Sequence, residues 1–291
     1  MKKILFVLTI LLLASCSQRL DFVGMVAGQS PVPDIRFEES MKYNEQNGSR
    51  DIITLTDTYR FYVGTDTHID SAYDHTAAYL RAFRNDLLAP FTLMLGDMIN
   101  ANGKTVWVSE LMREQAGLKQ NLIYPTLGNH DAYFNQWHEW QEQWGSSTYS
   151  FVVRTPLNRD LYICLESANG TLGKKQLKWL QELLDKSAKE NYRHIIVFSH
   201  THLFKKDASQ GHTSNFAIEE TQLLTELFSK YGVDWYLCGH DHSREITKFK
   251  GVTYITVDAL EEHYPNAYYM IATVGSDLRY EFVPVGEHDD N

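Results

Sequence analysis

Five short polar motifs along the chain each follow directly after a run of apolar residues. The motifs are Asp66-Thr67-His68, Gly96-Asp97-Met98-Ile99-Asn100, Gly128-Asn129-His130-Asp131, His200-Thr201-His202 and Gly239-His240-Asp241-His242. In open α/β architectures, ligands collect at the carboxyl ends of strands, where loops from several strands converge. A chain that repeats this arrangement five times is therefore expected to place its strand ends together at one functional edge.

The apolar runs alternate with longer amphipathic segments. Runs typical of buried strands occupy 61–64, 91–95, 122–126, 161–165, 194–198 and 236–238, and helical spacing marks 71–85, 136–144, 174–189 and 218–231. The C-terminal part changes to strands at 252–257, 267–274 and 278–284, which short turns are expected to join. This order predicts an α/β fold class with a two-sheet β-sandwich core flanked by α-helices.

The first 16 residues have the pattern of a signal peptide. Two lysines precede an apolar stretch at 4–13, and Leu13-Ala14-Ser15-Cys16 resembles a bacterial lipobox, whose cysteine is lipidated and becomes the first mature residue. We expect Cys16 to anchor the chain to a membrane, outside the cytoplasm and in the cell envelope. The alternative is an ordinary cleaved signal peptide in which Cys16 is incidental.

The length of 291 residues allows one large domain or two small ones, and we expect a single domain after this leader. Residues 17–50 are polar and rich in turn formers, which indicates a spacer or an added edge strand; the domain itself is expected over 51–286, with a tail over 287–291. The net charge of −10 argues against a nucleic-acid partner, which normally requires a basic face. An acidic chain still binds phosphate where metal ions supply positive charge.

Two cysteines remain besides Cys16. Cys164 and Cys238 both lie at apolar runs, so buried free thiols are expected. A disulfide between them is the alternative in an oxidising compartment, although two cysteines make no disulfide framework.

Each motif contains residue types that bind metals. Asp66 and His68, two residues apart after a strand, are able to point at one site, and a lone carboxylate such as Asp97 is able to bridge two cations. Asn129 offers an amide oxygen, and His130 is suited to contact a leaving oxygen. Histidines at 200, 202, 240 and 242 complete the set. Taken singly, most of these motifs are also common in turns and polar loops, so the joint pattern carries the interpretation.

The order of these motifs resembles the calcineurin-like metallophosphoesterase family, whose elements are Asp-x-His, Gly-Asp, Gly-Asn-His-Asp/Glu, a lone His and Gly-His-x-His. The resemblance covers about residues 60 to 245. It implies one metal ion held by Asp66, His68 and His242, a second held by Asn129, His200 and His240, and Asp97 bridging both. It also implies that His130 is a catalytic residue near the substrate phosphate.

Two positions depart from the family pattern. Asn100 stands where many members have an acidic residue, and His202 stands where relatives often have proline. Neither departure removes a ligand. We therefore expect His202 to shape the pocket, and we group it with Asn129, His130 and Tyr133 as candidate substrate-binding residues.

The function implied is metal-dependent hydrolysis of a phosphomonoester or phosphodiester, a hydrolase acting on ester bonds. Two cations clamp phosphate oxygens and supply hydroxide for in-line attack, and the N/O ligand set indicates Mn, Fe or Zn. The alternative is a non-catalytic metal-binding or scaffold protein on the same fold. No Gly-x-Ser-x-Gly elbow, P-loop or His-Glu-x-x-His motif supports another hydrolytic class.

The substrate class stays open between a small phosphoester and a lipid headgroup. Aromatic residues follow the third motif and would suit a nucleobase, a sugar or lipid: Tyr133, Phe134, Trp137, Trp140 and Trp144. The three tryptophans have helical spacing, which favours the interpretation that they belong to the core.

Overall fold

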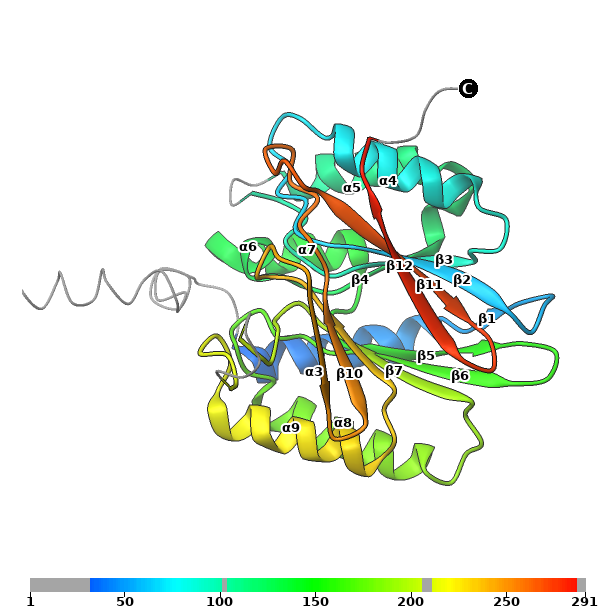
Figure 1. Ribbon diagram of the computed structural model, residues 1–291. Coiled ribbons are helices and arrows are strands. Elements are labelled where there is room, and N and C mark those ends of the chain that lie inside the picture. Colours follow the sequence, from blue (N-terminus) through cyan, green and yellow to red (C-terminus); the bar gives the residue numbers. More distant parts are fainter. Residues whose placement is uncertain (1–31, 101–103, 206–210, 287–291) are drawn as a thin grey trace, which may run out of the picture.

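The computed structural model describes residues 32–100, 104–205 and 211–286. Its elements form four layers, with two β-sheets packed face to face and helices on both outer faces (Figure 1). This arrangement confirms the predicted fold class. The signal peptide with Cys16, the first half of the expected spacer and the tail at 287–291 lie outside the described residues.

The first sheet has seven strands in the order β1-β5-β6-β7-β8-β10-β9. They are β1 (Ile52–Ile53), β5 (Tyr149–Arg154), β6 (Arg159–Cys164), β7 (His194–Phe198), β8 (Trp235–Cys238), β10 (Val252–Thr256) and β9 (Glu245–Phe249). Strands β6, β7, β8 and β10 are parallel, β5 runs antiparallel to β6 but parallel to β1, and β9 runs antiparallel to β10. The outer face is covered by α8 (Gly173–Ser187) and α9 (Ile218–Lys230), as Figure 1 shows.

The second sheet has five strands in the order β12-β11-β2-β3-β4. They are β12 (Leu278–Pro284), β11 (Tyr268–Val274), β2 (Tyr59–Gly64), β3 (Phe91–Met94) and β4 (Ile123–Pro125). Its outer face is covered by α4 (Asp74–Asn85), α5 (Thr105–Ala116) and α7 (Trp137–Trp144). Short helical turns complete the chain: η1 (Gly117–Leu122), α6 (Asn129–Ala132) and η2 (Tyr133–Asn135).

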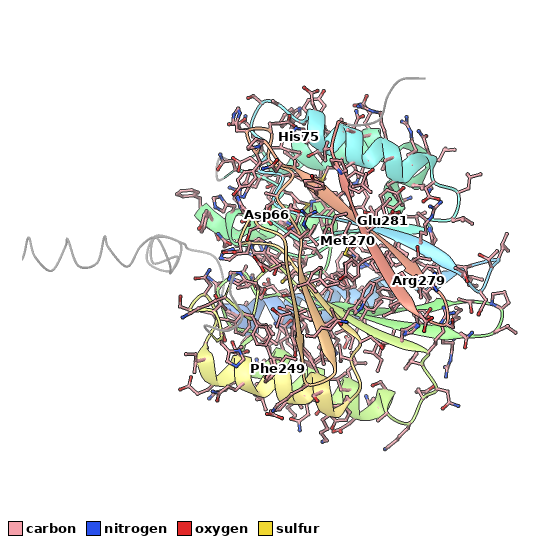
Figure 2. The ribbon with its side chains drawn as sticks, in the orientation of Figure 1. Asp66, His75, Phe249, Met270, Arg279 and Glu281 are labelled. Atoms are coloured by element: carbon pink, nitrogen blue, oxygen red, sulfur yellow. The ribbon has the colours of Figure 1, made fainter. Side chains whose placement is uncertain are left out.

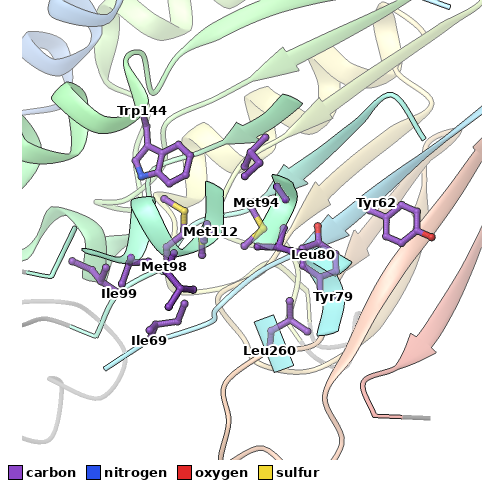
Figure 3. Close-up of a cluster of buried hydrophobic side chains, with 14 of the residues drawn as sticks. Tyr62, Ile69, Tyr79, Leu80, Met94, Met98, Ile99, Met112, Trp144 and Leu260 are labelled. Carbon is purple, nitrogen blue, oxygen red and sulfur yellow. The ribbon is translucent and has the colours of Figure 1, made fainter. Parts of the chain in front are cut away.

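Alternating side chains on the strands build three hydrophobic clusters. In β6, Tyr162 and Cys164 face the layer between the sheets, whereas Leu161 and Ile163 face α8 and α9. This period of two is the ordinary geometry of a strand that is buried on both faces. The third cluster lies between the second sheet and its helices and contains Met94, Met98, Met112 and Trp144 (Figure 3).

The prediction of a spacer or an added edge strand over 17–50 is wrong for its second half, which forms helix α3 (Pro33–Asn47). Pro33 occupies the first turn, where a missing N–H costs nothing, and the helix ends before Gly48, whose φ is 75°. Only a few apolar side chains lie on this helix, and it is fixed mainly by polar contacts such as that between Arg36 and Glu166. A helix attached in this way carries little apolar periodicity.

The sequence pattern also failed to predict several other elements. Helix α5 and strands β1, β5 and β9 were not expected. The C-terminal strands do not form one meander of short turns, because β10 belongs to the first sheet and β11 to the second. The chain therefore crosses between the sheets after β10, and this crossing brings Leu260 against Gly64 and Tyr79.

Cys164 and Cys238 are both buried free thiols, which confirms the expected state and excludes the disulfide between them in this structure. Across residues 32–100, 104–205 and 211–286, no helix is long and apolar enough to cross a membrane.

Candidate metal centre

The five polar motifs meet at one edge of the paired sheets, because each follows the carboxyl end of a parallel strand. Asp66 and His68 follow β2, Asp97 follows β3, Asn129 and His130 follow β4, His200 follows β7, and His240 and His242 follow β8. In Figure 2, Asp66 lies toward the side where α6 projects in Figure 1, and Arg279 lies toward the other side. The predicted functional edge is thus present in the fold.

The first group of candidate ligands is Asp66, His68 and His242, whose ligand atoms lie within 4.8 Å of one another. The two imidazole Nε2 atoms are 3.1 Å apart. Asp66 Oδ1 lies 3.3 Å from His242 Nε2 and 3.8 Å from His68 Nε2. Three donor atoms therefore converge on one point.

The second group is centred on His200. Its Nε2 lies 3.0 Å from Asn129 Oδ1, 3.1 Å from His240 Nδ1 and 3.2 Å from Asp97 Oδ2. The same Asp97 Oδ2 is 3.8 Å from His68 Nε2 in the first group. One carboxylate oxygen thus lies between the two groups.

The hydrogen bonding of His200 shows that this second group suits a cation. Its Nδ1 lies 2.8 Å from the carbonyl oxygen of Leu95, which only accepts, so Nδ1 carries a hydrogen and Nε2 of the neutral ring carries a lone pair. That lone pair faces oxygen atoms of Asn129 and Asp97, which also carry lone pairs. Converging lone pairs are stabilised by a positive charge, and mixed N/O donors suit Mn, Fe or Zn.

The protonation states point the same way. Burial would raise the pKa of Asp97, but the adjacent His200 holds it well below its usual range, and His242 does the same for Asp66. Burial would lower the pKa of His200, yet Asp97 raises it to about 9, which shows how strongly this point favours a positive charge. Burial and then His200 lower the pKa of His240 to about 3, so its ring is neutral. Ionised carboxylates and a neutral His240 ring are forms that bind metals, and a metal ion at His200 would displace the proton that Asp97 favours there.

The backbone of the candidate ligands is strained. Left-handed φ values occur at Asp66 (49°), His68 (42°), Asp97 (50°), His240 (72°) and His242 (51°). Such values are uncommon for residues other than glycine and cost on the order of 1 kcal/mol or more each. The surrounding fold holds these residues in place, and strain of this kind concentrates at functional sites.

Two glycines allow the motif loops to pack together. A Cβ at Gly128 would lie 2.1 Å from Asp97 Oδ1, and a Cβ at Gly239 would lie 2.3 Å from Asp66 Oδ2. Only glycine fits at these distances, so the carboxylates rest directly on the backbone of the neighbouring motif.

His130 lies beside the first group. Its backbone N–H donates to Asp97 Oδ1 at 2.8 Å, and its ring meets that of His68 edge-on at 4.6 Å. Ligand atoms of His68, Asp97 and His130 also lie within 4.8 Å of one another. Burial lowers the pKa of His130, which keeps the ring neutral at neutral pH. His130 therefore borders the first group of candidate ligands.

The other two candidate substrate-binding residues, His202 and Tyr133, occupy different positions. His202 is buried, its Nε2 lies 2.9 Å from Thr213 Oγ1, and its ring packs 5.6 Å from that of His240. Tyr133 is half-buried, and its ring lies 4.8 Å from that of His130. Both residues thus border the candidate ligands.

The aromatic residues after the third motif divide as their helical spacing suggested. Trp137, Trp140 and Trp144 are buried and belong to the core, whereas Phe134 is 61% exposed. The interpretation of the tryptophans as core residues is confirmed.

Asp131 is a residue to which the sequence analysis assigned no role. Its buried carboxylate accepts hydrogen bonds from the backbone N–H groups of Gly128 at 3.0 Å, Met98 at 2.9 Å and Ile99 at 3.3 Å. Burial and then Asp97 raise its pKa to about 7. Asp131 therefore joins the second motif to the third, and its place within the Gly128–Asp131 motif was the available signal.

Several solved structures share this fold. A dimetal phosphatase from Danio rerio superposes with a TM-score of 0.60 at 14% identity, covering 78% of this chain and 98% of that one. Purple acid phosphatase from yellow lupin seeds gives 0.60 at 14%, covering 80% of this chain and 52% of that one. A putative 5′-nucleotidase from Staphylococcus aureus gives 0.55 at 17%, covering 78% and 54%, so the chain spans about half of each of the last two proteins.

These identities establish a shared fold alone. The search of curated proteins found no match. Residues 59–244, which contain all five motifs, match the calcineurin-like phosphoesterase family over most of the described chain. The chain therefore belongs to the calcineurin-like phosphoesterase family.

Proposed function

We propose that the chain hydrolyses a phosphomonoester or phosphodiester at a dinuclear metal centre. The observation that carries this proposal is the convergence of two ligand groups on a shared carboxylate oxygen of Asp97, 3.2 Å from His200 Nε2 and 3.8 Å from His68 Nε2. Membership of a phosphoesterase family supports the reaction class.

In this proposal Asp66, His68 and His242 hold one ion, and Asn129, His200 and His240 hold the other. Asp97 contributes to both. Mn, Fe or Zn ions bound there would neutralise charge on phosphate oxygens and lower the pKa of water to supply a nucleophile at neutral pH.

The protein residues orient the substrate within this centre. His130 is placed by its backbone hydrogen bond to Asp97 and by ring contacts with His68 and Tyr133. Its neutral ring carries one N–H, which donates a hydrogen bond to the departing oxygen and stabilises the negative charge that develops there. In this proposal Asn129 and His202 would border the bound phosphate, and Tyr133 lies next to His130.

The compartment and the substrate class rest on the sequence. We propose that Cys16 is lipidated and tethers the enzyme in the cell envelope, with its substrate a small phosphoester or a lipid headgroup and no nucleic-acid partner. Mass spectrometry of the detergent-extracted chain tests the anchor, because replacement of Cys16 by serine should remove both the lipid mass and the membrane association.

Hydrolysis of p-nitrophenyl phosphate and bis-p-nitrophenyl phosphate tests the reaction. Asp97→Ala and His240→Ala should each lower the rate of the metal-loaded enzyme at least 100-fold, on the order of the loss when one catalytic group is removed. His138→Ala is the matched control, because His138 is an exposed histidine on α7. Full activity in Asp97→Ala would refute the proposal.

The same experiment addresses the second candidate, a non-catalytic scaffold. GAP50 from Plasmodium, described as the anchor in the inner membrane complex, superposes with a TM-score of 0.58 at 13% identity. A chain that binds two metal ions but hydrolyses neither ester would favour a binding role.

A further inference from the structure

Asn129 is the first residue of the short helix α6, and Tyr133, four residues later, is the first residue of the turn η2 that follows it. Residues spaced by four positions lie on one face of a helix, so the two side chains meet. Asn129 Nδ2 donates a hydrogen bond of 2.9 Å to the Tyr133 hydroxyl, and Asn129 Oδ1 faces His200 Nε2 at 3.0 Å. The amide therefore has one end in the metal centre and the other on the phenol.

We propose that Tyr133 is a positioning residue for the second metal ion and acts through the amide of Asn129. This inference rests on the proposed function, since it assumes that Asn129 Oδ1 is a ligand. By accepting a hydrogen from Nδ2, the hydroxyl fixes the amide plane and draws electron density toward Oδ1. Hydrogen bonds in a chain polarise one another in this way, and the groups that support ligands in metal sites act likewise.

The local backbone directs Tyr133 toward the centre. The next two residues, Phe134 and Asn135, have left-handed φ values of 54° and 64°. This turn leaves Phe134 61% exposed, whereas the Tyr133 ring packs at 4.8 Å against His130. The strained turn thus separates two neighbouring aromatic residues, one directed to the centre and one to solvent.

Asn129 is only 7% exposed, so water does not readily replace the Tyr133 hydroxyl as the acceptor for Nδ2. Loss of the hydroxyl leaves Nδ2 without the acceptor it has in this structure, while the Tyr133 ring is preserved by phenylalanine. The effect of Tyr133→Phe is therefore expected at one ion and not at both.

Zinc binding to the metal-free protein, followed by competition with a chromophoric chelator, tests the inference. Wild type should bind two Zn²⁺ ions, and Tyr133→Phe should bind the second roughly 10- to 100-fold more weakly while the first is unchanged. Phe134→Leu, on the same turn, should match wild type. The melting temperature of the metal-free Tyr133→Phe variant should equal that of wild type.

The same substitution in an Asn129→Asp protein distinguishes a positioning role of Tyr133 from a purely structural one. In Asn129→Asp the side chain has no N–H, so the Tyr133 hydroxyl donates a hydrogen bond to the carboxylate and withdraws electron density from it. In this background, Tyr133→Phe should leave the affinity for the second ion unchanged or raise it. A purely structural role would weaken binding in both backgrounds.

Equal zinc affinities in wild type and Tyr133→Phe would overturn the inference and leave the proposed function intact. An equal loss of affinity for both ions, or the same loss in the Asn129→Asp background, would also overturn it. Wild type that binds fewer than two ions would overturn both proposals, because the dinuclear centre itself would be absent.

Discussion

Helix α3 is held to the domain by a buried ion pair, and breaking that pair should destabilise the fold strongly. Arg36 and Glu166 are each 1% exposed. The guanidinium donates to Glu166 through Nε at 3.1 Å and through Nη2 at 3.0 and 3.1 Å. Replacing Arg36 by methionine keeps much of the side-chain volume and removes every one of these hydrogen bonds.

The magnitude follows from what remains after the substitution. Arg36→Met leaves the Glu166 carboxylate buried, with the backbone N–H of Ala168 at 2.9 Å as a donor to Oε1. Breaking a buried pair by removing one partner typically costs about 3–5 kcal/mol. Because replacing both partners by apolar residues is often neutral, Arg36→Met with Glu166→Leu should recover most of that loss.

Urea unfolding of the metal-free protein at pH 7 measures these free energies. Lys175→Met is the matched control, because Lys175 on α8 pairs with Glu38 of the same helix α3, but the two side chains are 47% and 57% exposed. An exposed pair contributes at most about 1 kcal/mol. A loss below about 1 kcal/mol in Arg36→Met would refute the reasoning, since it would mean that the buried carboxylate finds other solvation.

Three further predictions concern the centre and the pH dependence of stability. Gly128→Ala would place Cβ 2.1 Å from Asp97 Oδ1, so hydrolysis of p-nitrophenyl phosphate should fall at least about tenfold, whereas Gly275→Ala, whose nearest neighbour would be 3.4 Å away, should be active; an active Gly128→Ala enzyme would contradict the packing. Burial lowers the pKa of His194, but Asp234 and the Gly275 carbonyl raise it above its ordinary value. The stabilisation that protonated His194 contributes is therefore fully present below about pH 6.5 and is lost as pH rises through the folded pKa. Between pH 5.5 and 8.5, the free energy of urea unfolding should decline less in His194→Gln than in wild type. An equal decline in both would show that His194 is not the source of this pH dependence. Chelation of the metal ions should lower the melting temperature, with recovery on adding Zn²⁺, because ligands that bind only the folded state stabilise it; a melting temperature insensitive to chelator would count against tight binding.

The strands and helices with strong periodicity were predictable because their burial is regular. The run at 194–198 coincides with β7, and the helix expected at 174–189 is α8 at Gly173–Ser187. Helix α3 was not predictable in this way, since its attachment depends on Arg36 and on Ser40, whose hydroxyl lies 3.2 Å from that of Ser147. A polar residue reveals such a role only when its distant partner is known.

The candidate site could be predicted further than the fold around it. The spacing of the motifs, together with the family resemblance, identified residues that the structure brings within ligand distance of one another. The hydrogen bond that orients His200 could not be predicted, because the acceptor is the backbone carbonyl of Leu95. Backbone groups are the same at every residue, so the sequence carries no sign of which one is used.

The sequence by itself determined which atoms are available to bind metal, through the residue types of the five motifs and their order. It also determined the alternation of strands and helices through periodic burial. Only the tertiary structure decided that α3 packs on the domain and that β10 and β11 belong to different sheets. It also decided that Asp97 Oδ2 lies between the two ligand groups and that Asp131 joins two motifs. These are contacts between residues far apart in the chain, and their energies depend on distance and burial that no local pattern encodes.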